Sequence, residues 1–549
     1  SGIATGKLSR LHRPDGSRQE ISYDAHGRPT QYTDTRDGTE QLSLDNLGRI
    51  TRRTTGHAVG SHYSSTLYYV WDANSQRTQL SLNGQTQNAT YDAAGQLATL
   101  SDSAGNITRF SHDAAGRLTS IERSDGSSSH YRYTADGHLS GIEQLDAAHQ
   151  PLARFDYTHN ANGQRTQAVE ELPNLARTIT WQHDAAGQLT EERITQTRPT
   201  AHTLTTHYTH DAVGNRTQKT VTGAESYRVD YVYDQNDRLT EERHSQRGTT
   251  RYRYDGNGNL SEKEEPSQTT RYRWNSDNRL IKVERGSTTI EYAYDPQGRR
   301  IKKLLTDGST RRETHYLIDA ERPYHEIVTE RTQTNNGPAS NRTYLHTPGG
   351  LGELISDTDG TTTRQIYSDG QGSTRLITDG TTRHTYSFDA FGTLTSGTAN
   401  ASHLYSGEHY DPDTGLIHLR ARDYDPRIGR FISMDEHPGD HRIPLTLNKY
   451  LYANADPVNF RDPSGNFGLA GVSMGSVSPA LRSVSISSFS RSAIGLARKS
   501  KMYDIHSYAS WPLHFYMFAE RKLVKSGIRY DVGNEYGWGN MKEVFKNAL

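Results

Sequence analysis

The sequence contains no cysteine, so disulfide bonds, thiolate catalysis and cysteine-ligated metal sites are all excluded. That absence fits a protein made in a reducing cytosol. Long apolar runs are also missing, since no stretch approaches the ~20 residues that a transmembrane helix needs. Apolar residues make up only 32% of the chain and its mean hydropathy is −0.88, values that are low for a compact globule.

Intrinsic disorder is the simplest interpretation of such a polar composition. Three features oppose it: the net charge is only −1, there are 33 tyrosines against 11 phenylalanines, and turn signals recur at a steady interval. Tyrosine has an apolar ring and a polar tip, which suits a sheet with water near both faces. The composition therefore favours an extended or hollow β-structure.

One phrase recurs through the first 300 residues: an aromatic residue or histidine, then aspartate, two residues, glycine, a polar residue and usually leucine. Its clear copies start at Tyr23, Tyr91, His112, His183, His210, Tyr233, Tyr254 and Tyr294, and weaker ones start at Leu44, Tyr133 and Trp274. The interval from Asp92 to Asp113 is 21 residues, as is that from Asp234 to Asp255. A regular period of this size indicates a repeat array.

Each copy of the phrase has the chemistry of a β-turn. Aspartate accepts hydrogen bonds from the backbone that follows it, and glycine tolerates positive φ. The flanking segments alternate in polarity, as in 251–254, which is the period of a strand. We therefore predict a shell of antiparallel hairpins over residues 1–300, whose exposed edges require the ribbon to curl or close.

Metal binding is not expected among these repeats. Histidines that take the tyrosine position of the phrase, such as His112, are interpreted as strand residues, and no tight ligand set occurs. We expect no metal and no cofactor.

Residues 301–466 form a second region in which glycine-rich turns replace the strict phrase. Its most specific part runs from Asp413 to Phe431, with the strings DTGL, LRARDYDP and GRF, and it closes with DPSG at 462–465. Together with the repeats, these strings resemble the Rhs, or YD-repeat, family, whose relatives include the C subunit of Tc toxins and the teneurin shell. The resemblance implies an all-β hairpin spiral that closes into a hollow cocoon around a toxin domain, with residues 301–466 as its core, plug and self-cleavage site.

Peptide hydrolysis without a metal or a thiolate needs an activated water and a proton donor. Two carboxyl groups that share one proton provide both, because like charges in contact split their pKa values. The resemblance implies that Asp435 and Asp462 form such a pair, assisted by Arg422, as an aspartic-type autoprotease. It also implies cleavage just after the DPSG element, which we place between Asn466 and Phe467.

Simpler roles for these residues remain open. Both aspartates have the sequence context of turn caps, and Arg422 can form a plain salt bridge. Asp440 and Asp456 are alternative members of the acid pair. The interval of 27 positions from Asp435 to Asp462 exceeds the usual spacing, with an insertion at 438–444, and Asn466 replaces the common leucine.

The last segment, 467–549, differs in composition, with eleven lysines and arginines against five acidic residues. We predict a small, partly helical toxin domain or its N-terminal part. Nuclease, ADP-ribosyltransferase and membrane-active functions remain open, and the positive charge favours a polyanionic target. The candidate toxin residues are His506, His514, Glu520, Asp531 and Glu535.

The resemblance further implies a secreted bacterial effector of interbacterial competition. Its partners would be its own C-terminal toxin as cargo, a cognate immunity protein and a type VI spike of the VgrG/PAAR type. Because the chain starts within repeat-like sequence, we expect the spike-binding region to lie upstream of Ser1. The alternative is a structural or adhesive YD-repeat surface protein that neither cleaves itself nor carries a toxin.

Overall fold

The computed structural model describes residues 7–56, 64–82, 84–350, 352–398, 400–439, 444–466 and 469–470. These residues form strands, turns and three short 3-10 helices, and no α-helix occurs among them. No helix in the described ranges is long and apolar enough to cross a membrane. The prediction of an all-β hairpin array is confirmed, whereas the partly helical tail lies outside the described residues.

The chain divides into two compact units, at Ser1–Thr66 with Ser483–Leu549, and at Leu67–Arg482. The strands of the first unit are β1 (Arg10–His12), β2 (Arg18–Tyr23), β3 (Pro29–Asp34), β4 (Gly38–Leu44) and β5 (Ile50–Gly56). They pair in sequence order as an antiparallel ladder.

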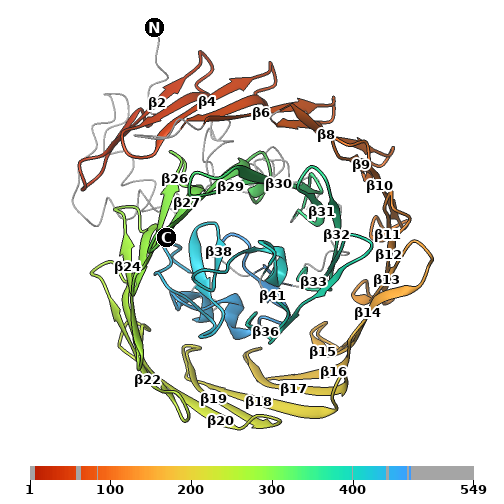
Figure 1. The fold of residues 1–549 in the computed structure, drawn as a ribbon, viewed down its shortest axis with the longest axis vertical. Helices are drawn as coiled ribbons and strands as arrows, with labels where there is room; N and C mark the ends of the chain where they lie inside the picture. The colour runs from red at the N-terminus through yellow and green to blue at the C-terminus, as the bar shows by residue number, and fades with distance from the viewer. Residues whose placement is uncertain are drawn as a thin grey trace, which may run out of the picture. The chain divides into compact units, whose positions relative to one another are not determined.

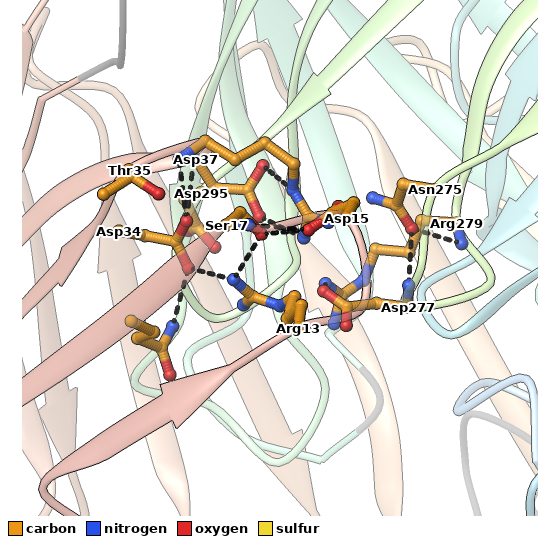
Figure 2. Close-up of polar contacts among 12 residues, drawn as sticks. Arg13, Asp15, Ser17, Asp34, Thr35, Asp37, Asn275, Asp277, Arg279 and Asp295 are labelled. Carbon is orange, nitrogen blue, oxygen red and sulfur yellow. Dashed lines mark hydrogen bonds and ion pairs between the residues drawn. The ribbon is translucent and has the colours of Figure 1, made fainter.

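A buried ion pair fixes the first two hairpins of this unit. Figure 2 shows the guanidinium of Arg13 against the carboxylate of Asp34. The two groups lie 2.8 Å apart, and their side chains are 5% and 0% exposed. The same carboxylate accepts a hydrogen bond from Gln19 and caps the backbone N–H of Asp37. The charge of Asp34 is therefore paired and also accepts hydrogen bonds, as a buried charge requires.

The second unit contains strands that pair with their sequence neighbours, and the first of them, β6, starts three residues before the unit does. They are β6 (Ser64–Trp71), β7 (Arg77–Leu82), β8 (Gln85–Tyr91), β9 (Leu97–Ser101), β10 (Ile107–His112), β11 (Leu118–Glu122), β12 (Ser128–Tyr133), β13 (Leu139–Leu145), β14 (Pro151–His159), β15 (Arg165–Leu172), β16 (Leu175–His183), β17 (Leu189–Arg198), β18 (His202–His210), β19 (Arg216–Gly223), β20 (Tyr227–Tyr233) and β21 (Leu239–His244). They continue as β22 (Gly248–Tyr254), β23 (Leu260–Glu265), β24 (Gln268–Trp274), β25 (Leu280–Arg285), β26 (Thr288–Tyr294), β27 (Arg300–Asp307), β28 (Thr310–Asp319), β29 (Glu326–Thr334), β30 (Ala339–His346), β31 (Leu354–Thr358), β32 (Thr363–Ser368), β33 (Thr374–Thr378) and β34 (Arg383–Thr385).

Short elements follow this long antiparallel sheet. They are β35 (Ser387–Phe388), β36 (Leu394–Ser396), η1 (Tyr405–Gly407), β37 (His409–Asp411), β38 (Leu416–Leu419), β39 (Arg422–Asp425), β40 (Arg430–Phe431), η2 (Pro444–Leu447), η3 (Ala453–Ala455), β41 (Phe460–Arg461) and β42 (Leu469–Ala470). Strands β37 to β40 form a small sheet of their own.

The turn after β8 shows how the repeated phrase produces a hairpin. Asp92 accepts hydrogen bonds from the backbone N–H groups of Ala94 and Gln96, and Gly95 has a φ of +75°. The register between β8 and β9 shifts at Tyr91, which is a β-bulge. The hydroxyl of Tyr91 donates to the carbonyl of Arg77, 2.9 Å away in the preceding hairpin. Aspartate and glycine thus make the turn, and tyrosine joins it to the previous repeat.

The sheet of the second unit winds over itself in two layers, as Figure 1 shows where β30 to β33 lie inside β8 to β13. Polar side chains of the outer layer bind the inner layer: Gln87 donates to the carbonyl of Tyr344, and Gln144 donates to that of Ser368. Arg77 of β7 forms a buried ion pair with Asp319 of β28. Leu345 and Ile355 of the inner layer belong to the same apolar core as the outer strands.

The segment 400–466 lies inside the curve of the second unit's sheet (Figure 1). Leu416, Ile428 and Ile432 pack into the apolar core of strands β20 to β27. Tyr292 donates a hydrogen bond to Asp411, 2.6 Å away, and Arg300 pairs with Asp423 at 2.7 Å. The wall therefore holds this segment through both apolar and charged contacts.

Candidate functional site

Arg422 is the residue on which the candidate site converges. It is the first residue of β39, its side chain is 6% exposed, and its guanidinium lies 3.6 Å from the ring centre of Phe431. Its Nη2 atom lies 2.9 Å from Asp435 Oδ2 and 3.7 Å from Asp462 Oδ2. The structure thus brings together the three residues that the sequence selects, across 40 positions of the chain.

Asp435 is held beside Arg422 by its own backbone. Its N–H donates to the carbonyl of Lys449, which also accepts from Arg422 Nη1, both at 2.9 Å. Its Oδ1 atom accepts the N–H of His437 at 2.7 Å. Burial raises the pKa of Asp435 to about 6, and Asp462 adds to the rise while Arg422 opposes it. A carboxyl group of this pKa can exchange a proton near neutral pH.

Asp462 is more deeply placed, with a side chain that is 2% exposed. Its Oδ1 accepts hydrogen bonds from the hydroxyl of Ser464 at 2.9 Å and from the N–H of Asn466 at 3.1 Å. The two Asp462 oxygens therefore face different groups: one lies on the side of Arg422 and the other on the backbone of the DPSG element. These contacts also make Asp462 a turn cap, as the simpler interpretation expects.

The backbone of the DPSG element lies against the β38–β39 turn. The carbonyl of Gly465 accepts a hydrogen bond from Arg422 Nε, and the carbonyl of Ser464 accepts from the N–H of Ala421. Gly465 has a φ of +74°, and a Cβ atom there would stand 2.2 Å from the carbonyl oxygen of Leu419. Only glycine fits this position without displacing the backbone.

Burial also acts on the arginine itself. It lowers the pKa of Arg422, while the nearby charges of Asp435 and Asp462 act in the opposite direction. One guanidinium thus contacts two carboxylates and two peptide carbonyls in a place with little water. Such a donor stabilises negative charge that develops on the carbonyl oxygen during hydrolysis.

The comparisons with known proteins agree with this architecture. Residues 154–458, more than half of the chain, match the Teneurin YD-shell family, and residues 91–128 match the RHS Repeat family. The chain belongs to the teneurin YD-shell family.

Curated relatives of this YD-shell chain share shorter stretches. The tRNA3(Ser)-specific nuclease WapA of Bacillus spizizenii is 33% identical over 161 residues, which are 28% of this chain and 7% of the nuclease. The tRNA nuclease WapA of Bacillus subtilis is 40% identical over 87 residues, which are 15% of this chain and 4% of that protein. Salivary gland surface protein 1 of Aedes aegypti is 31% identical over 137 residues, or 24% and 4%. The YD-shell chain therefore spans at most 7% of the length of these relatives.

Solved Tc toxin structures have the same fold. The crystal structure of TcdB2-TccC3-TEV superposes with a TM-score of 0.68 at 18% identity, over 84% of this chain and 25% of that one. The Photorhabdus luminescens Tc holotoxin pore gives a TM-score of 0.68 at 18% identity, over 82% and 25%. The YD-shell chain thus has the fold of about a quarter of each of these longer chains.

Of the two alternative members of the acid pair, the structure describes Asp456 but not Asp440. Asp456 lies 3.1 Å from His183 Nε2 and accepts hydrogen bonds from Asn459, so its partners are on β16 and its own loop rather than Arg422. Asp440 and Phe467 lie outside the described residues, and with Phe467 so does the predicted Asn466–Phe467 bond. The toxin candidates also lie outside them: His506, His514, Glu520, Asp531 and Glu535.

Sequence reasoning missed two supports of the YD-shell site. The first is the carbonyl of Lys449, which fixes both Arg422 and the Asp435 backbone. A backbone acceptor leaves no signal in residue types. The second is Ser464, whose hydroxyl binds Asp462, and its place in the DPSG string was the available signal.

Proposed function

We propose that this chain is the shell of a toxin and that it encloses and cuts off its own C-terminal segment, 467–549. The sheet closes around that segment, and Asp435, Asp462 and Arg422 hydrolyse one peptide bond once per molecule. The observation that supports this proposal is the placement of one Arg422 guanidinium between the two carboxylates and the Gly465 carbonyl.

The proposed step is a simple hydrolysis. The ionised member of the acid pair takes a proton from a water molecule while the water oxygen adds to the carbonyl carbon of the scissile bond. The protonated member gives its proton to the leaving amide nitrogen, and the products are a carboxyl and an amine. Arg422 stabilises the oxyanion that forms in between. The two aspartates act as one coupled pair, so neither is assigned a fixed role.

The scissile bond lies between Gly465 and Phe467. The sequence predicts the Asn466–Phe467 bond, and the geometry adds a rival, since Arg422 contacts the carbonyl of the Gly465–Asn466 bond. The N-terminal residue of the released piece distinguishes them. A piece that starts at Phe467 supports the first, and a piece that starts at Asn466 supports the second.

Enclosure would keep the toxin from the cell that makes it, and cleavage would free it covalently while the wall still holds it. We propose that the tail is a nuclease, because its net charge of +6 suits a polyanion and two relatives are named tRNA nucleases. We further propose that the chain is secreted on a type VI spike and that a cognate immunity protein binds its toxin.

Two measurements on one purified sample test the function. Denaturing electrophoresis is expected to show two pieces, and size-exclusion chromatography without denaturant is expected to show them in one peak. A single uncut band would overturn self-cleavage. Two pieces that separate without denaturant would overturn enclosure. An uncut and inert chain would favour the surface-protein alternative, a class represented by the Aedes aegypti relative.

A further inference from the structure

Three buried residues far apart in sequence converge on one point of the second unit: Glu326, His346 and His403. Glu326 is the first residue of β29, His346 is the last of β30, and His403 pairs with His409 in an isolated bridge before β37. One possible ligand atom of each lies within 4.8 Å of those of the other two. No local motif marks this group, because a span of 77 positions separates its ends.

The imidazole ring of His403 is deeply buried, since the residue is 2% exposed. Within the described part of the chain, neither of its ring nitrogens has a hydrogen-bond partner. Its ring packs edge-on against Tyr344 and His346, at centroid distances of 4.7 and 5.5 Å. A buried polar nitrogen without a partner is costly, so an orphan of this kind calls for a partner such as a water or an ion.

His346 gives a second, independent sign. Its Nδ1 lies 3.2 Å from the carbonyl oxygen of Gly352, and its Nε2 lies 3.2 Å from that of Ile327. A neutral imidazole has one N–H, and a carbonyl can only accept, so one of the two nitrogens presents a lone pair to an acceptor. Metal-bound histidines commonly donate their other N–H to a backbone carbonyl, which accounts for one of these contacts.

The surroundings allow a cation there. Glu326 pairs with Arg420 at 2.5 Å, and the same guanidinium pairs with Glu408 at 2.8 Å, so two buried carboxylates share one arginine. Arg322 also acts on Glu326, so two arginines offset the two carboxylates and the affinity for a cation must come from the ligand atoms themselves. Glu326, Glu408 and His403 all line one small cavity, which supplies space for a water molecule.

We propose that Glu326, His346 and His403 bind a divalent transition-metal ion, with Zn²⁺ as the natural occupant. Two imidazoles and one carboxylate are ligands that Zn²⁺ accepts, and the cavity leaves the fourth position to water. Ca²⁺ and Mg²⁺ do not suit the site, because they require oxygen ligands. The ion would fasten β29 and β30 of the wall to the segment before β37.

The test is metal binding by the untagged full chain. The protein is stripped with EDTA and dialysed, and ZnCl₂ is titrated by calorimetry while CoCl₂ is followed by visible absorption. The wild type is expected to bind one ion more than His403→Ala or Glu326→Gln, and these variants are expected to lose about 100-fold or more in affinity at that site, the loss that even an outer-shell change can cause. EDTA is expected to lower the melting temperature of the wild type but not of these two variants.

The matched control is the double variant His138→Ala, His159→Ala. His138 lies in the turn before β13 and His159 is the last residue of β14, and their rings stack at a centroid distance of 5.2 Å. Both are far from Glu326 in the chain, so the control should bind like the wild type. Circular dichroism and size-exclusion chromatography establish that each variant folds. If His403→Ala does not fold, Glu326→Gln and the wild-type titration decide. A wild type without the extra ion, or a Glu326→Gln variant that binds it equally well, overturns the proposal.

Discussion

The guanidinium of Arg422 lies 2.9 Å from the carboxylate of Asp435, and the same nitrogen atom reaches Asp462 at 3.7 Å. A salt bridge alone would need only one of these acids. Two carboxylates on one buried arginine, with a peptide carbonyl on another of its nitrogens, form an arrangement suited to hydrolysis of the adjacent backbone.

The first prediction concerns the acid pair. Asp435→Asn or Asp462→Asn removes one titratable partner while it keeps the side-chain volume, so the proton can no longer be passed between them. The self-cleavage rate is expected to fall by at least about 100-fold, the typical contribution of a general acid or base. Intact mass spectrometry of freshly purified chain measures the uncut fraction. Asp456→Asn, a buried acid with His183 as its partner, is the control and should cleave normally.

The second prediction concerns pH. The pKa of Asp435 is raised to about 6, so this carboxyl becomes protonated as the pH falls through 6 and ionised above it. If the pair must hold one proton, the rate should decline as the pH rises from 6 to 8. The rate is measured on Arg422→Lys, which keeps the positive charge but loses the two-pronged set of donors. This variant should cleave slowly enough for uncut protein to be purified and its cleavage followed at each pH. A rate that is flat between pH 5.5 and 8 would contradict the shared proton.

Much of the fold follows from the sequence because turn chemistry is local. Asp92 and Gly95 occupy their turn for reasons that are visible in one heptapeptide, and the repeats carry the same information many times over. The overlap of β7 with β28 is different. Arg77 and Asp319 meet across more than 240 positions, and no residue pattern indicates which later strand an outer strand will cover.

The functional residues likewise divide into those that the sequence indicates and those that only the structure reveals. Arg422, Asp435 and Asp462 were selected by resemblance to a family pattern, and the structure brings them together. The buried group of Glu326, His346 and His403 could not be found, since its members are scattered histidines that resemble strand residues in the sequence. The metal site proposed for them depends on burial and on the two ring nitrogens of His403 that lack a partner, which only the three-dimensional packing defines.

The third prediction concerns Gly465. A Cβ atom at this residue would stand 2.2 Å from the Leu419 carbonyl oxygen, at a φ of +74°. Gly465→Ala is therefore expected to push the DPSG element away from Arg422 and to slow cleavage, with the acid pair intact. Gly256→Ala is the matched control, because a Cβ there meets nothing within 4 Å. Equal cleavage by both variants would show that cleavage does not depend on the observed position of the DPSG element beside Arg422.

The last prediction concerns the two layers of the wall. Arg77 and Asp319 pair with side chains that are 6% and 0% exposed, so Arg77→Ala leaves a buried carboxylate without its partner. Loss of one member of a buried pair costs about 3–5 kcal/mol. Arg253 pairs with Glu262 while 60% exposed, and Arg253→Ala should cost no more than about 1 kcal/mol. Urea denaturation followed by tyrosine fluorescence compares the free energies of unfolding of the two variants.

Because removal of the second partner also removes the uncompensated buried carboxylate, the double variant Arg77→Ala, Asp319→Ala should recover part of the loss. Equal destabilisation by Arg77→Ala and Arg253→Ala would mean that the pair does not hold the layers together, and that the apolar core around Leu345 and Ile355 does so alone.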